Sequence, residues 1–376
     1  MSEFSLADHQ FMQRAIELAK RGHFTTSPNP RVGCVLVKNG DIIGEGFHKK
    51  SGQGHAEVYA LKQAGDNAKG ATAYVTLEPC SHYGLTPPCA EALIKAQVTH
   101  VIAAMVDPNP KVSGRGLKML EAAGISTQFG LLEPDARALN PGFIHLMTTK
   151  KPYVRCKLAA SLDGKTAMAS GESQWITGSE ARSDVQRLRA QSCAIICGAE
   201  SVMFDNARMN VRWQALGTIK NTYAEADVRQ PVRIVIDSKN RLTPDLAMFQ
   251  TSGKILLIRR AIENSHTWPH FVEQVMVPKA RNSDYIDLAL LLDVLAKQGL
   301  NDVLIESGAQ LAGAFISENL VDELILYQAP KLIGSDGKSL VNMPSIMQLS
   351  ATKNVNITDI RMLGQDIRIT ATFSRS

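Results

Sequence analysis

The chain has 376 residues, 44% of them hydrophobic, which is enough for two ordinary domains that each bury a core. Its apolar runs are short, and none approaches the roughly 18 residues that a membrane-spanning helix needs. The net charge of +5 is spread evenly, because residues 1–150 hold 15 Lys and Arg against 13 Asp and Glu. The short apolar runs therefore predict that the chain is not a membrane protein. Because it has no long basic run, the sequence also predicts that it does not bind nucleic acids.

The six cysteines are unevenly spaced and do not resemble the dense disulfide framework of a small secreted domain. The N-terminal residues are acidic where a secretory signal would be basic and then apolar. We therefore expect a cytoplasmic protein whose cysteines are thiols, either buried or bound to a metal.

The first 150 residues predict alternating helices and strands. Residues 5–21 carry apolar side chains on one face of a helix. Two strand-like runs, residues 32–37 and 42–47, flank Asn39-Gly40, a dipeptide suited to the positive φ angles of a tight turn. The pattern then favours helices packed on a sheet, with a helix at 56–64, a strand at 73–77, a helix from Pro88, a strand at 101–106 and a helix at 116–123.

A second domain is expected after the basic, proline-containing junction at residues 150–152, which divides the chain into residues 1–150 and 151–376. Thr177, with Glu180 three residues later, predicts the N-cap of a helix. Residues 357–362 and 367–373 flank a Gly-Gln-Asp turn and predict an antiparallel hairpin that closes the sheet. Further elements are predicted between them, namely strands at 153–159, 194–197, 233–236 and 254–258 and a helix at 288–300.

A metal site is predicted from one histidine and two cysteines of the first domain. His55, Cys80 and Cys89 supply one nitrogen and two sulfur ligands, which leaves one position of a tetrahedral zinc ion open for water. Glu57 follows His55 by two residues and is close enough to move protons without binding the metal. The combination of His-x-Glu with Pro-Cys is typical of zinc deaminases.

The spacing of the two cysteines departs from the general deaminase motif. Eight residues separate Cys80 from Cys89, where the motif has two. The geometry survives if Pro87-Pro88 begins the helix that carries Cys89, because proline suits the first helical turn. The alternatives are a closed structural site, with His82 or Cys34 as fourth ligand, or no metal, but neither would use Glu57.

Four segments resemble the deaminase half of the bifunctional deaminase-reductases of riboflavin biosynthesis. These are residues 27–33, 55–57, 77–82 and 107–110, and the wide cysteine spacing is also typical of that family. The resemblance implies hydrolysis of the 2-amino group of a diaminopyrimidinone that bears a phosphoribosylamino substituent. It also implies that Asn29 binds the base or the sugar, although Asn29 between two prolines equally suits a simple turn.

The first domain could instead act on a base within RNA. Such an enzyme needs an electrostatic groove and aromatic stacking platforms. Residues 1–150 have a surplus of only two positive charges, 15 against 13, and few aromatic residues. The small-molecule substrate is therefore the preferred interpretation.

The second domain lacks the Gly-x-Gly-x-x-Gly motif of an ordinary dinucleotide-binding domain. A strand at 303–305 ends in Glu306-Ser307-Gly308 and precedes a helix at 311–317, which would direct free N–H groups at a phosphate. Considered alone, this pattern indicates a tight turn with no ligand more readily than a phosphate site.

Further segments resemble the reductase half of the same family, which is related in fold to dihydrofolate reductase. They are residues 157–165, 173–177, 184–189, 237–238 and 306–309, together with Asp205 and Arg212, and the likeness is weakest at 214–230 and 260–285. The resemblance implies that NADPH reduces the opened ribose of the deaminated substrate to a ribityl chain.

The same resemblance assigns residues to the reductase site. Arg189 and Arg212 suit a sugar phosphate, because guanidinium groups bind its oxygens in a fork, and the substrate would also contact Ser173, Met209 and Glu306. Lys157 and Asp205 are candidates for the catalytic proton, although a surface ion pair is an equal alternative. Trp175 would stack on a flat ring unless it belongs to the core. The cofactor would lie against Ala159, Trp175, Ser201, Asp205, Ser238, Gly308, Ala309, Gln310, Leu311, Ala312, Gly313 and Ala314.

Together these patterns predict an α/β protein with an N-terminal cytidine-deaminase-like α/β/α zinc domain, followed by a dihydrofolate-reductase-like α/β domain. We expect Zn²⁺ and NADPH as cofactors, small phosphoribosylaminopyrimidines as substrates, and a homo-oligomer. Two alternatives stay open from the sequence: a nucleic-acid-binding module with a structural zinc site, or an enzyme in which only one half is active.

Overall fold

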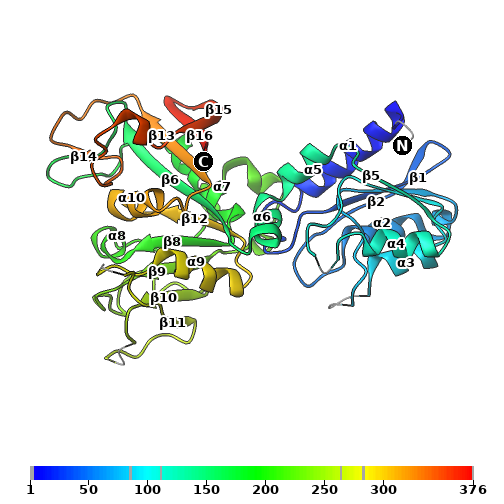
Figure 1. The fold of residues 1–376 in the computed structure, drawn as a ribbon, viewed down its shortest axis with the longest axis horizontal. Coiled ribbons are helices and arrows are strands. Elements are labelled where there is room, and N and C mark those ends of the chain that lie inside the picture. Colours follow the sequence, from blue (N-terminus) through cyan, green and yellow to red (C-terminus); the bar gives the residue numbers. More distant parts are fainter. Residues whose placement is uncertain (1–3, 84–86, 111, 263–264, 282–283, 375–376) are drawn as a thin grey trace. The chain divides into compact units, whose positions relative to one another are not determined.

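The computed structural model describes residues 4–83, 87–110, 112–262, 265–281 and 284–374. The chain divides into two compact units, Met1–Lys150 and Lys151–Ser376, each with its own sheet (Figure 1). Among the described residues, no helix combines the length and the apolar character that crossing a membrane requires.

The first unit is a five-stranded sheet with the strand order β2-β1-β3-β4-β5. The strands β1 and β2 form an antiparallel hairpin, β1 is also antiparallel to β3, and β3, β4 and β5 are parallel. The strands are β1 (Gly33–Lys38), β2 (Asp41–Phe47), β3 (Thr72–Val75), β4 (His100–Ala103) and β5 (Ser126–Phe129). The helices are α1 (Leu6–Lys20), α2 (Ala56–Ala64), α3 (Cys89–Lys95), α4 (Arg115–Ala122), α5 (Glu133–Leu139) and α6 (Pro141–Thr149), with a 3₁₀ helix at Gly65–Ala68.

Helices cover both faces of this sheet, as the sequence predicts. One apolar cluster joins α1 and α5 to Val35, Val37 and Ile102 on one face. A second joins α2, α3 and α4 to Cys34 and Leu36 on the other face. The predicted hairpin turn is confirmed, because Asn39 and Gly40 have φ angles of 55° and 86°.

Glycines of β2 allow α2 to lie directly on the strand. A Cβ atom at Gly46 would lie 2.2 Å from the Ala56 carbonyl oxygen, and one at Gly44 would lie 2.3 Å from that of Ala60. Only glycine permits this approach of backbone to backbone. The first turn of α2, which carries Glu57, is therefore fixed against the end of β2.

The second unit is a nine-stranded sheet with the order β11-β10-β9-β8-β12-β6-β13-β16-β15. Neighbours from β11 to β13 are parallel, and the antiparallel hairpin of β15 and β16 completes one edge. The strands are β6 (Tyr153–Ser161), β8 (Ala194–Gly198), β9 (Val232–Ile236), β10 (Ile255–Arg259), β11 (Val272–Met276), β12 (Asp302–Glu306), β13 (Glu323–Ala329), β15 (Val355–Leu363) and β16 (Asp366–Phe373). The short strands β7 (Lys165–Ala167) and β14 (Lys338–Ser339) pair separately.

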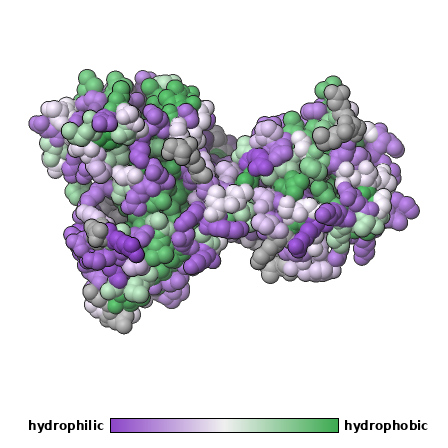
Figure 2. All heavy atoms as spheres, viewed as in Figure 1, coloured by the Kyte–Doolittle hydropathy of each residue, from purple (hydrophilic) through white to green (hydrophobic). Residues whose placement is uncertain are grey.

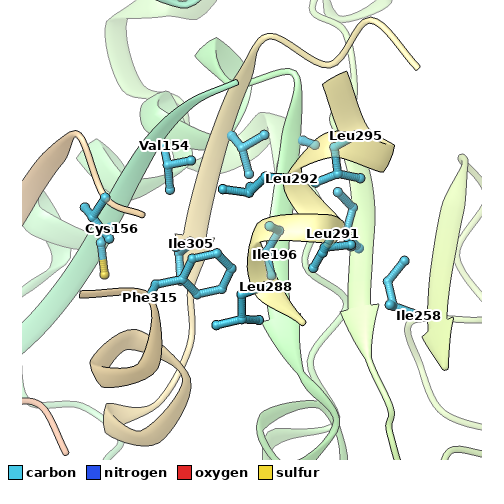
Figure 3. Packing of buried hydrophobic residues seen from close by; sticks show 14 of the residues in the cluster. Val154, Cys156, Ile196, Ile258, Leu288, Leu291, Leu292, Leu295, Ile305 and Phe315 are labelled. Atoms are coloured by element: carbon cyan, nitrogen blue, oxygen red, sulfur yellow. The ribbon is translucent and has the colours of Figure 1, made fainter. Parts of the chain in front are cut away.

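The helices of this unit are also divided between two faces. They are α7 (Ser179–Gln191), α8 (Ala199–Asp205), α9 (Leu288–Lys297) and α10 (Ala309–Ser317), with 3₁₀ helices at Trp213–Ala215, Gly217–Asn221, Glu225–Asp227 and Leu349–Ala351. The leucines of α9 pack with Ile196, Ile258 and Ile305 in the core on one face (Figure 3). Side chains of α7 and α8 join the core on the other face.

One boundary differs from the sequence prediction. The N-cap of α7 is Gly178 rather than Thr177, and no side chain caps this helix. The N–H of Gly178 donates to the Asp366 carboxylate (2.7 Å), which places Gly178 at the start of the helix. A distant residue therefore provides the anchor that the local pattern assigned to Thr177.

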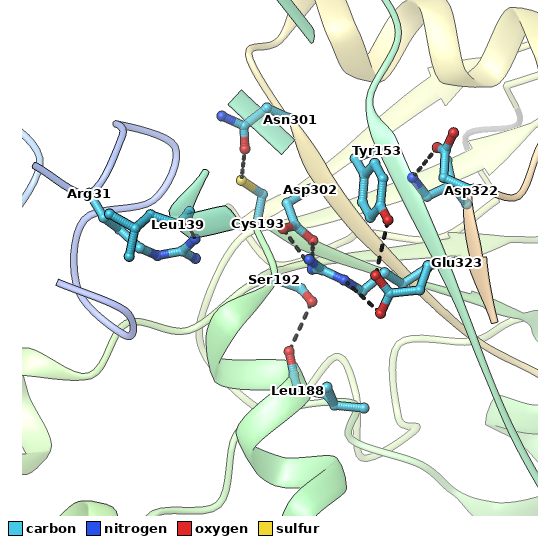
Figure 4. A network of polar contacts seen from close by, with 12 residues as sticks. Arg31, Leu139, Tyr153, Leu188, Ser192, Cys193, Asn301, Asp302, Asp322 and Glu323 are labelled. Carbon is cyan, nitrogen blue, oxygen red and sulfur yellow. Dashed lines mark hydrogen bonds and ion pairs between the residues drawn. The ribbon is translucent and has the colours of Figure 1, made fainter. Parts of the chain in front are cut away.

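A buried ionic group joins three parallel strands near their N-terminal ends. Arg155 of β6 donates to both carboxylate oxygens of Asp302 on β12 (2.5 and 2.7 Å) and lies 3.5 Å from Glu323 of β13. Tyr153 donates its hydroxyl to Glu323 (3.0 Å), and Figure 4 shows Tyr153, Asp302 and Glu323 close together. The group ties β6, β12 and β13 together.

We expect Asp302→Ala to destabilise the second unit by about 3 kcal/mol, because it leaves the Arg155 guanidinium buried without its main partner. All three tryptophans of the chain, Trp175, Trp213 and Trp268, lie in this unit. Tryptophan fluorescence during urea unfolding therefore reports on the second unit alone.

The matched control is Glu273→Ala, which removes an ion pair with Lys254 whose side chains are about half exposed. Exposed pairs contribute roughly 0 to 1 kcal/mol. Equal unfolding midpoints for the two variants would contradict the role given to the buried group.

Candidate zinc site and cofactor pocket

Three side chains from separate segments of the first unit converge on one point. His55 is the N-cap of α2, Cys80 follows β3, and Cys89 is the first residue of α3. One ligand atom of each lies within 4.8 Å of the others, and His55 Nδ1 is 3.2 Å from the Cys89 sulfur. Pro88 is the N-cap of α3, so the helix begins one residue after the predicted start at Pro88.

The charge state of Cys80 suits a metal ligand. The side chain of Cys89 lowers the pKa of Cys80 most, whereas burial raises this pKa. Contacts with His55 and with the Cys89 N–H (3.3 Å) lower it further, to about 4. The lowered pKa favours the thiolate form of Cys80, which is the form that binds metals. One imidazole and two sulfurs match the donor set that zinc prefers.

Glu57 lies beside these ligands in the first turn of α2. The residue is only 3% exposed, and its Oε2 atom has no hydrogen-bond partner among the described residues. Burial raises the pKa of this carboxyl group, and the nearby Cys80 raises it further. A buried carboxylate oxygen without a partner is costly unless a ligand or a proton satisfies it.

No fourth ligand of a closed site is found among the described residues. In that part of the chain, the only cluster with metal-ligand geometry consists of His55, Cys80 and Cys89, and neither His82 nor Cys34 belongs to it. His82 is exposed, whereas Cys34 is buried in the core. The loop between the cysteines includes residues 84–86, which lie outside the described residues. The donor set thus agrees with an open site.

Asn29 is connected to the site through His48, a residue that the sequence analysis did not single out. His48 Nδ1 is 3.1 Å from the Gly54 carbonyl oxygen, so Nδ1 carries the proton of the neutral ring. Its Nε2 atom then accepts from Asn29 Nδ2 (3.2 Å), and the two rings of His48 and His55 are in edge contact at 5.4 Å. The Asn29 amide is thereby oriented through one of its two N–H donors. No local pattern around His48 predicts this role.

A second unassigned residue, Glu78, supports the neighbouring loop. Its buried carboxylate accepts the N–H groups of Asp107, Gly114 and Gly116 at 2.8 to 3.0 Å. The segment after β4 is therefore held against the residues around Cys80. Asp107 lies in this segment, where burial raises its pKa to about 6.

The second unit contains a cavity of about 1790 Å³. It lies at the C-terminal ends of the parallel strands β6, β8, β9 and β12, the edge where α/β sheets bind ligands. Most residues predicted for the reductase site line it, namely Lys157, Ala159, Ser173, Trp175, Arg189, Ser201, Asp205, Met209, Arg212, Ser238, Glu306, Gly308, Ala309, Gln310, Leu311 and Ala314.

Two residues predicted for the cofactor do not line the cavity. Ala312 is fully buried in the core beneath α10. A Cβ atom at Gly313 would lie 2.0 Å from the backbone oxygen of Asn342, so this glycine permits close packing of the helix. On a helix, only part of a run of seven consecutive residues can face one ligand.

A buried ion pair lies in the cavity wall. Arg189 donates two hydrogen bonds to Glu306 (2.8 Å each) and one to the Asn210 carbonyl oxygen. Burial alone would raise the pKa of Glu306, but Arg189, Lys157 and Arg212 lower it to about 2. The guanidinium group of Arg189, which is predicted to bind a phosphate, therefore binds Glu306. Arg212 is exposed, and its charge acts on Glu306 without a direct hydrogen bond.

Lys157 lies beside this pair rather than on the surface. Burial lowers the pKa of its ammonium group, and the charge of Glu306 opposes that effect. Asp205 is exposed instead and accepts a hydrogen bond from Gln174 (2.8 Å). Trp175 is 58% exposed, so it does not belong to the core, and the Arg182 guanidinium lies 4.9 Å from its ring centre.

The chain matches two family models, described as the cytidine and deoxycytidylate deaminase zinc-binding region over residues 6–105 and the RibD C-terminal domain over residues 152–369. It is 50% identical to the riboflavin biosynthesis protein RibD of Escherichia coli, over 96% of this chain and 98% of that protein. The Haemophilus influenzae RibD protein is 49% identical over 99% of both chains.

Solved structures agree over nearly the full length. Acinetobacter baumannii RibD superposes with a TM-score of 0.89 at 45% identity, covering 98% of this chain and 99% of that one. A Thermotoga maritima deaminase and reductase gives 0.84 at 30% identity with the same coverage. The chain belongs to the RibD family, the bifunctional deaminases and reductases of riboflavin biosynthesis.

Proposed function

We propose that residues 1–150 remove the 2-amino group of a diaminopyrimidinone bearing a phosphoribosylamino group, and that residues 151–376 then reduce the ribosyl chain with NADPH. The observation that carries the first step is the His55, Cys80 and Cys89 cluster beside the buried carboxylate of Glu57. The similar Thermotoga maritima protein is a diaminohydroxyphosphoribosylaminopyrimidine deaminase and 5-amino-6-(5-phosphoribosylamino)uracil reductase, which supports both substrates.

In the first step, His55, Cys80 and Cys89 would hold zinc, which when bound would supply an activated water molecule. As the water oxygen bonds to the ring carbon and the carbon–nitrogen bond breaks, Glu57 would take a proton from the water and pass it to the amine, which leaves as ammonia. The raised pKa of Glu57 suits both transfers, because a general acid-base group works best with a pKa near the operating pH. Asn29 offers its carbonyl oxygen to an N–H group of the pyrimidine, in the orientation that His48 fixes.

In the second step, the cavity of the second unit would hold NADPH, which when bound would supply a hydride for the sugar carbon. Lys157 donates a proton to the heteroatom on that carbon, and its lowered pKa makes the ammonium group a better donor. Glu306 stays ionised beside it and stabilises the ammonium form. Arg212 then binds the substrate phosphate, since Arg189 is already engaged by Glu306.

A second cationic group of the cavity favours NADPH over NADH. Lys239 and Arg241 line the cavity just after the end of β9. In the sheet, β9 is three strands away from β6, so the two strands lie about 14 Å apart. A dinucleotide with its nicotinamide near Lys157 and its pyrophosphate at the N-terminus of α10 would bring its adenosine toward β9. Lys239 and Arg241 would there bind the 2′-phosphate, which NADH lacks.

Replacing Glu57 by Gln tests the proton carrier. Ammonia release should fall by roughly a hundredfold to ten-thousandfold, the usual contribution of a general acid-base group. Zinc content should be unchanged, because Glu57 is not a ligand, and NADPH oxidation with the deaminated substrate should continue at the wild-type rate. A variant that releases ammonia at near wild-type rate would contradict the assignment.

A double-mutant cycle tests the link between His48 and Asn29. We expect Asn29→Ala and His48→Leu each to raise the KM of deamination about fivefold to thirtyfold, as expected for one lost hydrogen bond. The double variant should be no worse than Asn29→Ala alone, since His48 acts through Asn29. Zinc analysis controls for damage to His55. Fully additive effects would show that His48 acts independently.

The double variant Lys239→Ala with Arg241→Ala tests cofactor selection. Calorimetric binding of NADPH should weaken about tenfold or more, because charge-assisted bonds to a phosphate are lost. Binding of NADH is the internal control and should not change. Equal weakening of both cofactors would place the 2′-phosphate elsewhere.

A further inference from the structure

Residues 208–212, which we call the 208–212 segment, run along the cavity of the second unit without belonging to a helix or a strand. The segment connects α8 to the 3₁₀ helix at Trp213–Ala215. Many hydrophilic atoms lie on the surface where Figure 1 places α8 (Figure 2). In the part of the chain that the structure describes, residues 208–211 make no hydrogen bond from backbone to backbone. Four members of the segment line the cavity, namely Arg208, Met209, Asn210 and Arg212.

Side chains of α7 hold one side of this segment. Arg189 donates a hydrogen bond to the Asn210 carbonyl oxygen (2.9 Å), and Gln186 accepts the N–H of Arg212 (2.9 Å). Arg189 and Gln186 are three positions apart, so they lie on the same face of the helix. Gln186 is only 1% exposed, and its side chain is therefore directed inward, onto the segment.

The other side of the segment is held by residues in and just before β9. The Gln230 side chain accepts the N–H of Val211 (2.8 Å) and donates to the Val211 carbonyl oxygen (3.0 Å), as a neighbouring strand would. Arg233 donates to the carbonyl oxygen of Arg208 (3.4 Å). Side chains from two separate elements therefore take the place of backbone partners.

The conformation of the segment requires such support. Met209 has a φ angle of 53°, in the left-handed region, which costs a residue with a side chain about 1–3 kcal/mol. Met209 and Val211 are buried, whereas Arg208 and Arg212 are exposed, so the buried residues anchor a backbone that presents two arginines. Strained residues that the surrounding structure holds in place cluster at active sites and ligand sites.

The arginines around the segment leave a surplus of positive charge. Arg182 and Arg208 act on Arg212 through their charge. The charge of Arg189 acts there too, but Arg189 is paired with Glu306. Such a surplus attracts a multiply charged anion, and a guanidinium group can bind two oxygens of one phosphate. Forked binding depends on geometry, so the place from which Arg212 extends decides whether it can occur.

We propose that Gln186 and Gln230 are positioning residues for the substrate phosphate, because they fix the backbone from which Arg212 reaches it. This inference rests on the proposed function, in which Arg212 binds that phosphate. Gln186 holds the N–H of Arg212 itself, and Gln230 holds both polar backbone groups of the preceding residue. A group that is held in place before binding loses less freedom when the ligand arrives, which increases affinity.

The alternative is that the glutamines only stabilise the second unit. Gln230 is exposed, and replacing an exposed side chain usually changes the free energy of unfolding by no more than about 0.5 kcal/mol. The two explanations also differ in which ligand is affected. A general loss of structure would weaken the binding of substrate and cofactor alike, whereas a loss of positioning would weaken only the binding of the phosphorylated substrate.

Steady-state kinetics of the full chain with the deaminated substrate test the proposal. Gln230→Ala should raise the KM for this substrate about tenfold, because two hydrogen bonds to the segment are lost. Gln186→Leu, which keeps most of the buried volume, should act in the same way. The kcat and the calorimetric affinity for NADPH should stay at their wild-type values, since only substrate binding is lost.

The matched control is Gln250→Ala. Gln250 is also exposed and donates to a backbone carbonyl oxygen, that of Pro244 (2.8 Å), away from the segment. The KM of this variant should equal that of the wild type. If Gln186→Leu does not fold, the exposed residue Gln230 still decides the outcome.

A double-mutant cycle separates the positioning role from the phosphate site on which it rests. Arg212→Ala should raise the KM by itself, and adding Gln230→Ala should raise it no further, because Gln230 acts through Arg212. A wild-type KM for Arg212→Ala would overturn the phosphate site. If Arg212→Ala does raise the KM, the positioning role alone is overturned by a wild-type KM in a folded glutamine variant, by additive effects in the double variant, or by an equal loss of NADPH affinity.

Discussion

The contact between α2 and β2 determines where the chemical groups of the first unit lie. Gly44 and Gly46 let the helix backbone rest on the strand, and any side chain at Gly46 would collide with the Ala56 carbonyl group. β2 ends just before His48, and α2 begins just after His55. The one contact therefore fixes both ends of the segment that carries His48 and His55, together with Glu57 in the first turn of α2.

The buried carboxyl groups of the two units, Glu57 and Glu306, differ in their hydrogen-bond partners and in the direction of their pKa shifts. In the first, Glu57 is buried with an oxygen that has no partner in the described part of the chain, a state that is tolerable only if a ligand or proton completes it. In the second, Glu306 is fully paired by Arg189, which holds it ionised beside Lys157. Burial thus raises the pKa of one carboxyl group, whereas a guanidinium lowers that of the other. This contrast suits a group that must exchange protons and a group that must keep its charge.

In the second unit, the ion pairs that stabilise the sheet and the residues that line the cavity lie at opposite ends of the parallel strands. Arg155, Asp302 and Glu323 join the N-terminal ends of the parallel strands, while the cavity occupies their C-terminal ends. The terminal hairpin extends this sheet, because β16 pairs with β13 and Asp366 accepts the N–H of Gly178 at the start of α7.

The sequence by itself determined the zinc-binding cluster, the neighbouring glutamate and the α/β architecture of both units, because ligand chemistry and hydrophobic periodicity are local properties. Through family resemblance it also indicated reductase-site residues, most of which line the second cavity. Only the tertiary structure decided that Arg189 is paired with Glu306, that His48 contacts Asn29, and that Gly178 replaces Thr177 as the cap. The same is true of Ala312, which faces the core, and of Gly313, which packs against the backbone of Asn342. Each of these depends on a partner distant in sequence, or on which side of an element a residue points, and neither is encoded in a residue's immediate neighbours.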